Sequence, residues 1–137
     1  MKKITRRELH PEKPQLDNLC SSILEIDPKV RYATVFARHG EFLYEHIRKG
    51  LTPLLDKEHA YRSFQQAIMQ WSSRQLLEKQ LGPAKYAMVE YEKVKRYTFY
   101  LDVHLILGVS TDVDANGKIL EKILELISVY TKEYDKV

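Results

Sequence analysis

The segment Val103-His-Leu-Ile-Leu-Gly-Val-Ser110 is almost continuously apolar and is interrupted only by His104. A strand that is apolar along both of its faces is typical of the centre of a sheet that is covered on both sides. We therefore expect residues 103–110 to form a central strand. His104 is then expected to be a core histidine with one hydrogen-bond partner rather than a metal ligand.

Four further strands can be assigned around this one. The β-branched and aromatic segment Val30–Ala37 and the segment Phe42–Ile47 flank Gly40, which predicts a hairpin. Residues Lys85–Glu92 alternate between apolar and polar side chains, and Arg96–Asp102 alternates in the same way. Val30–Ala37 lacks a polar face, so it is also expected to lie inside the sheet.

Three helices complete the pattern. Apolar residues from Leu16 to Ile26 follow a helical period, between Pro14 and Pro28. A long helix is expected from the capping residue Asp56 to about Leu81, where Gly82 and Pro83 end it, and a last helix spans Ile119–Tyr130. The order α-β-β-α-β-β-β-α predicts an α+β sandwich, with one five-stranded antiparallel sheet and helices on both faces.

The long helix carries two apolar strips. Met69 and Leu76 lie well away from the main strip, beside polar residues, and so form a second and weaker apolar face. The main strip is expected to face the sheet and consists of Ala60, Phe64, Ala67, Ile68 and Trp71.

The chain has 137 residues, which is typical of a single domain. We divide it into a basic arm at residues 1–15, one domain at 16–131 and a tail at 132–137. The arm carries the whole net charge of +3. It could touch nucleic acid or an acidic partner, or act only as a solubilising tail. The basic residues that would make such contacts are Lys2, Lys3, Arg6 and Arg7.

Several classes of protein are excluded by what the sequence lacks. A single cysteine, Cys20, rules out a disulfide framework, and it lies on an apolar helical strip where cysteine behaves as a small hydrophobe. There is no apolar run long enough to span a membrane, no signal-peptide pattern, no nucleophile elbow and no glycine-rich phosphate loop. We expect a cytoplasmic protein that is not an enzyme and needs no cofactor.

One segment imitates a calcium-binding loop. Asp112, Asp114 and Asn116 precede Gly117 with the spacing of an EF-hand loop, but Ile123 stands where the loop needs a bidentate glutamate. We therefore expect no metal there. The expected role of the segment is a turn that leads from a strand into the last helix and caps that helix.

Tyrosines are concentrated in two of the strands, beside several lysines. Exposed aromatics on a basic sheet are one way of binding RNA, but tyrosine is also enriched at protein interfaces. Glutamates dilute the positive charge and the body of the chain is neutral, so an interface is the preferred interpretation and nucleic acid the less favoured one. The four residues are Tyr86, Tyr91, Tyr97 and Tyr100.

The order, lengths and character of the elements from Leu16 to Tyr130 resemble the roadblock/LC7 domain, a longin-like and profilin-like sandwich. The segment Ile26–Ala33, followed by His39-Gly40, is also similar to small archaeal proteins of that fold. The resemblance implies the sheet order 2-1-5-4-3 and a homodimer built from the third strand and the long helix. Members of this family act mostly as non-catalytic platforms or regulators for small GTPases and motor complexes.

The expected function is therefore a homodimeric interaction platform, with a small GTPase as a possible partner. A ligand sensor of the profilin-like or PAS-like kind is the alternative, and a pocket of several hundred cubic ångströms between sheet and long helix would favour it. A Val89→Pro substitution is expected to disrupt the dimer by removing a backbone donor. The expected dimer interface consists of Tyr86, Met88, Val89, Tyr91, Met69 and Leu76.

Overall fold

The computed structural model describes the backbone of residues 14–135 and the side chains of residues 14–130. One antiparallel sheet, in the order β2-β1-β5-β4-β3, forms the middle layer, which confirms the expected α+β topology. Its strands are β1 (Val30–Ala37), β2 (Phe42–Ile47), β3 (Tyr86–Glu90), β4 (Val94–Tyr100) and β5 (Leu105–Asp112).

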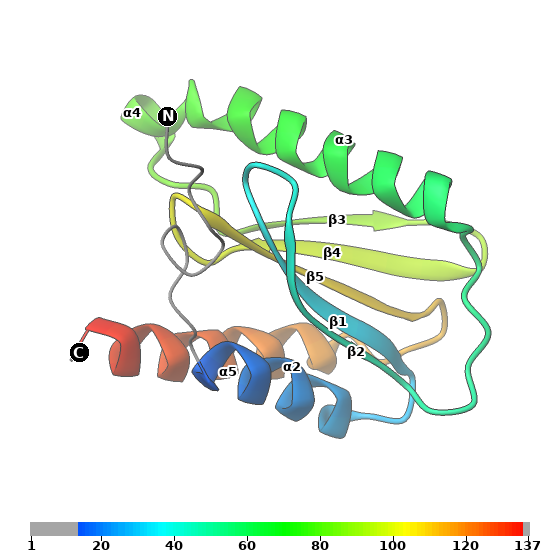
Figure 1. Cartoon of the computed structure of the whole chain (residues 1–137). Helices are drawn as coiled ribbons and strands as arrows, with labels where there is room; N and C mark the ends of the chain where they lie inside the picture. Colours follow the sequence, from blue (N-terminus) through cyan, green and yellow to red (C-terminus); the bar gives the residue numbers. More distant parts are fainter. Residues whose placement is uncertain (1–13, 136–137) are drawn as a thin grey trace, which may run out of the picture.

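Helices cover both faces of this sheet (Figure 1). Two of them lie together on one face, and the long helix crosses the other face above β3 and β4. The first pair is α2 (Pro14–Ile26) and α5 (Lys118–Asp135), and the other layer is α3 (Lys57–Gln75) with the short α4 (Glu78–Leu81).

The central strands β1 and β5 are buried on both faces, as their apolar sequences predict. Cross-strand pairs such as Val35–Leu107 point toward α2 and α5, where most of the core lies. The opposite face carries a smaller core of Phe36, Ile106 and Trp71. The two cores together explain why neither central strand has a polar side.

The layer formed by α3 is thinner than the layer on the other face. Trp71 is the only fully buried residue of α3, and it stacks on Tyr100 with ring centroids 5.2 Å apart. Phe64, Ala67 and Ile68 pack against the same small core but stay partly exposed. The sheet beneath α3 is therefore incompletely covered toward β3.

The long helix is shorter than expected. Asp56 caps it by accepting the His59 N–H, but the helix ends at Gln75 instead of continuing to Leu81. The Leu77 N–H bonds to the Arg74 carbonyl at 3.0 Å, a tight three-residue turn. Residues 78–81 bury no side chain, so no packing holds this end in one continuous helix.

The strand boundaries near His104 were also predicted wrongly. The Asp102 carboxylate accepts the N–H groups of His104 at 2.6 Å and Leu105 at 3.0 Å, which makes a tight turn. As a result β4 and β5 lie two residues away from the expected positions, and His104 is exposed in the turn rather than buried in the core. The hydrogen bonds of the Asp102 side chain, rather than the apolar pattern of the sequence, decide where these strands end and begin.

Two ends of the domain also differ from the boundaries drawn from the sequence. Helix α2 already begins at Pro14, inside the expected arm, and α5 continues to Asp135, inside the expected tail. The division of the chain into arm, domain and tail otherwise stays a prediction. In the described residues, no helix is both long and apolar enough to cross a lipid bilayer.

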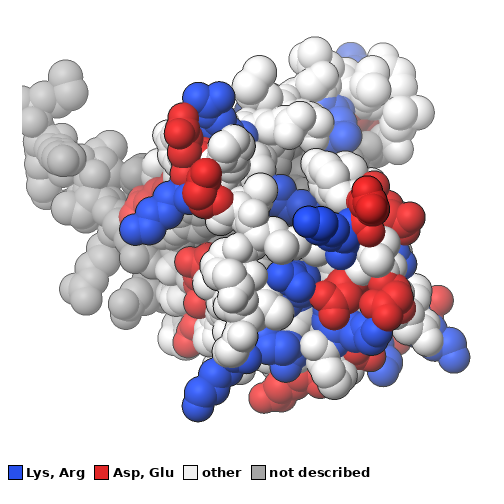
Figure 2. Space-filling view, turned by 90° about the vertical axis from the view of Figure 1, so that its right-hand side faces the viewer, with Lys and Arg blue, Asp and Glu red and all other residues white. Residues whose placement is uncertain are grey.

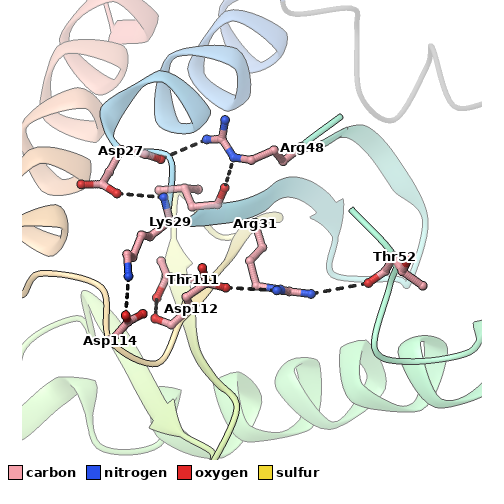
Figure 3. Close-up of polar contacts among 9 residues, drawn as sticks. Asp27, Lys29, Arg31, Arg48, Thr52, Thr111, Asp112 and Asp114 are labelled. Carbon is pink, nitrogen blue, oxygen red and sulfur yellow. Dashed lines mark hydrogen bonds and ion pairs between the residues drawn. The ribbon is translucent and has the colours of Figure 1, made fainter. Parts of the chain in front are cut away.

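Arg48, just after β2, ties three segments together (Figure 3). Its guanidinium donates to the carbonyls of Leu24 at 2.6 Å, Asp27 at 3.0 Å and Val30 at 2.7 Å. Carbonyls at the end of α2 have no partner within the helix, so a cation placed there satisfies them. Arg48 thereby fixes the end of α2 against the start of β1.

A substitution at Gly108 would test how tightly the sheet and α3 pack against each other. A Cβ atom at this position would lie 3.3 Å from Thr34 Cγ2 and 3.7 Å from Phe36. We expect Gly108→Val to lower the free energy of unfolding by about 1–3 kcal/mol through overpacking, measured by urea denaturation. Gly117→Val is the matched control, because nothing lies within 4 Å there, and it should change stability by less than about 0.5 kcal/mol. Equal effects of the two substitutions would contradict this account of the layer.

Candidate interaction surface

The residues that imitate a calcium loop are used by the fold itself (Figure 3). Asp112 lies in β5 and pairs with Arg31 at 3.0 Å, and Asp114 forms an ion pair with Lys29. The Asn116 side chain accepts the Lys118 N–H at the start of α5. The hydrogen bond and charge of Lys29 hold the pKa of Asp114 below its usual value. Within the described residues, no group of three metal-ligating side chains comes together.

The cysteine and the histidines do not come together in one site either. Cys20 is completely buried, and burial, reinforced by the negative charge of Asp17, raises the pKa of its thiol to about 12. A thiol with such a pKa stays protonated and unreactive near neutral pH. His46 bonds to Asp17 at 2.6 Å and His59 to Asp56 at 2.8 Å, both at the surface.

The four strand tyrosines do not share one exposed face. Tyr97 is buried, and Tyr100 stacks on Trp71 while its hydroxyl accepts a hydrogen bond from Arg74. Only Tyr86 and Tyr91 are exposed. A stacking platform for nucleic-acid bases needs several rings presented together, which these strands do not provide. The expected basic contacts Lys2, Lys3, Arg6 and Arg7 lie outside the described residues.

Charges on the end of the molecule where α3 begins are mixed. Figure 2 looks onto this end and shows Lys and Arg side chains interspersed with Asp and Glu. Part of this mixture is paired, as in the contact between Arg62 and Glu58 at 2.9 Å. An interspersed surface of this kind lacks the continuous positive stripe that nucleic acid selects.

Strand β3 is the edge strand next to α3 and is paired only with β4. Along β3, residues whose backbone N–H and C=O groups bond to β4 alternate with residues whose groups point away from the sheet. Tyr91 donates to Val94, and Lys85 accepts from Tyr100, so these positions bond inward. The register then turns Val89 toward β4 and leaves Met88 with its N–H and C=O pointing away from the sheet. Tyr86 and Glu90 share the outward orientation of Met88.

Apolar side chains flank this open edge on both faces. Met88 pairs with Tyr97 and so lies on the α2–α5 face, whereas Val89 pairs with Arg96 and lies on the α3 face. Between two-fifths and one half of the residue surface is exposed at each large apolar residue of the edge. These residues are Tyr86 (41%), Met88 (46%), Val89 (49%) and Tyr91 (49%).

The two helix residues expected at the interface are both exposed and lie seven residues apart, about two helical turns. Met69 is 71% exposed on a shallow flank of α3 that also includes Tyr61. Leu76 is 80% exposed at the end of α3, close in sequence to the exposed Leu77 and Leu81 of the α4 segment. Five other exposed apolar residues of this region were not singled out from the sequence: Leu54, Leu55, Tyr61, Leu77 and Leu81. Helical periodicity does not show where α3 and α4 lose contact with the sheet, and it does not apply to Leu54 and Leu55, which precede α3.

A narrow cleft lies between α3 and the β3–β4 half of the sheet. It holds about 120 Å³ and is lined on the helix side by Ser63, Gln66 and Gln70 and on the sheet side by Thr98. A ligand-sensor domain would be expected to enclose several hundred cubic ångströms. This enclosed cleft is smaller than that, and the spaces of that size beside α3, of about 650 and 660 Å³, are open hollows at the surface.

The fold matches solved structures, although no family model and no curated protein matches the sequence. A roadblock/LC7 domain from Streptomyces avermitilis is 17% identical with a TM-score of 0.66, covering 89% of this chain and 98% of its own. MglB from Myxococcus xanthus is 13% identical with a TM-score of 0.69, covering 92% and 99%. A structure described as MglB with a tetrameric arrangement is 14% identical with a TM-score of 0.69, covering 88% and 90%. The chain therefore has the roadblock/LC7 fold, as its sequence predicts.

The pairing of Asp112 and Asp114 leads to a prediction about calcium. Both carboxylates already have cationic partners, and Ile123 is buried in the core where a ligand would be needed. We expect about 5 mM calcium to shift the melting temperature by less than about 1 °C, measured by calorimetry. Micromolar calcium binding that Asp112→Ala abolishes would contradict this.

Proposed function

We propose that this protein is a non-catalytic homodimer that serves as a docking platform for another protein. The observation that supports this most directly is the open edge of β3, where outward backbone groups at Met88 are flanked by exposed apolar side chains. An uncovered apolar edge promotes aggregation, so proteins usually pair or cover it. A second copy of the same strand, related by a two-fold axis, would satisfy it.

The other edge of the sheet has a different character. Strand β2 also exposes two apolar residues, Phe42 (37%) and Ile47 (46%), but it presents the charged Glu45 beside His46, and His46 is bonded to Asp17 of α2. The segment after β2 is held by Arg48. Charges of this kind usually protect an edge strand from pairing. The contrast between the two edges favours β3 as the dimer edge.

Helix α3 would supply the rest of the interface. A stable interface buries at least about 1,000 Å² in total, more than two short strands can bury by pairing. Met69 and Tyr61 lie exposed on the flank of α3, where a partner helix could cover them. Self-association also occurs in this fold, since one of the similar structures is an MglB with a tetrameric arrangement.

The class of partner follows from the family resemblance rather than from a pocket. Small GTPases are the partners that the resemblance implies, and we propose one as the ligand of the platform. The buried, protonated Cys20 and the paired carboxylates of Asp112 and Asp114 support a role without catalysis.

Backbone groups in β3 point alternately toward β4 and away from it, and this alternation gives a sharp test of the dimer. We expect light scattering to find a dimer at about 10 µM. Met88→Pro should raise the dissociation constant at least about 100-fold with little change in melting temperature, because Pro is tolerated where the N–H points away from the sheet. Val89→Pro, which the sequence alone would choose, should instead lower the free energy of unfolding by about 1–3 kcal/mol, because Val89 bonds to β4.

A second pair of variants tests the helix. Met69→Glu places a charge in the proposed interface and should weaken the dimer, whereas Val129→Glu, at an exposed apolar position of α5 outside the interface, should not. A monomer at high micromolar concentration, or a dimer that tolerates both Met88→Pro and Met69→Glu, would overturn the proposed interface.

A further inference from the structure

Arg96, on the α3 face of β4, is a half-buried cation without a countercharge. Its Nη2 donates to the hydroxyl oxygens of Tyr32 at 3.0 Å and Ser63 at 3.2 Å. Across the described residues, no carboxylate lies within ion-pair distance of it, and its Nη1 and Nε make no hydrogen bond. A guanidinium stays charged at all relevant pH values, so partial burial without an anion is costly.

Arg96 also stands at the junction of two spaces. It lines the narrow cleft under α3, of about 120 Å³, and an open hollow of about 660 Å³ at the end of the molecule where α3 begins. Both spaces share Ser63, Gln66 and Tyr91 as well, so they adjoin one another. Figure 2 looks onto this end of the molecule.

The walls of the hollow combine apolar surface with positive charge. Leu54 and Leu55, from the segment before α3, face the hollow and are about half exposed. Val94 of β4 adds to the apolar wall, and Lys93 makes no ion pair within the described part of the chain. The opposing charge is Glu92. The lining thus suits a molecule with an apolar body and one anionic group.

We propose that this hollow binds a small amphipathic monocarboxylate. The carboxylate lies at the inner end of the hollow, where Arg96 joins it to the cleft. There it accepts hydrogen bonds from Arg96 Nη1 and from the hydroxyl of Tyr32, which lines the cleft side of this junction and whose oxygen already accepts from Arg96. The hydrocarbon body lies against Leu54, Leu55 and Val94. The proposal does not rest on the dimer, because the hollow is built from residues of a single chain.

Nuclear magnetic resonance titration of the full chain with hexanoate tests the proposal. We expect millimolar binding, with shifted amide signals at Ser63, Tyr91 and Arg96. Arg96→Gln should weaken binding at least about tenfold, because a charge-assisted hydrogen bond is lost. Arg38→Gln is the matched control and should leave affinity unchanged, since Arg38 lies over Trp71, outside the hollow.

One further variant and one further ligand test which groups recognise the carboxylate. Tyr32→Phe keeps the ring and removes the hydroxyl, so it should reduce affinity for hexanoate a few-fold even if Arg96→Gln perturbs folding. Hexanamide should bind at least about tenfold more weakly than hexanoate. Equal binding of the amide, no shifts up to about 20 mM hexanoate, or tenfold tighter binding of hexyl phosphate would each overturn the proposal. Light scattering on the same samples reports the dimer separately.

Discussion

The pairing of β1 with β5 at the centre of the sheet is the constraint on which the rest of the structure depends. The cross-strand pair Val35–Leu107 presents apolar groups to α2 and α5, while the neighbouring pair Phe36–Ile106 presents them to α3. Two strands that are apolar on both faces cannot lie at an edge or under a single layer of helices. Helices on both faces and a sheet order that keeps β1 and β5 inside follow from this.

The two helical layers contribute unequally to the core. The α2–α5 layer covers most of the core and includes the fully buried Ile23 and Ile123. The α3 layer contributes only Trp71 as a fully buried side chain, and it leaves a cleft and an exposed edge beside it. Surfaces for partners usually come from the less tightly packed parts of a fold. Both proposed sites accordingly lie on the α3 side or at the adjacent edge.

Much of the fold could be predicted from sequence because local signals agreed with one another. Gly40 and the apolar runs on either side of it gave β1 and β2 with their observed bounds, and Asp56 marked the start of α3. The errors arose where one side chain or a missing contact decided the outcome. Asp102 shifted β4 and β5 by its own hydrogen bonds, and the loss of packing after Gln75 divided the long helix.

The candidate site depended on information that no local pattern contains. Alternation along β3 predicts which side chains share a face, but only the pairing of Tyr91 with Val94 determines which backbone groups point outward. In β3 these two alternations coincide: Tyr86 and Met88 face α2 and α5 and offer their backbone to a partner, while Val89 faces α3 and bonds inward. A partner strand would therefore bond to the outward-pointing positions of β3. The hollow instead uses Arg96, which pairs with Val89 on the α3 face of the sheet. The two proposed sites lie on one hairpin without competing for the same backbone groups.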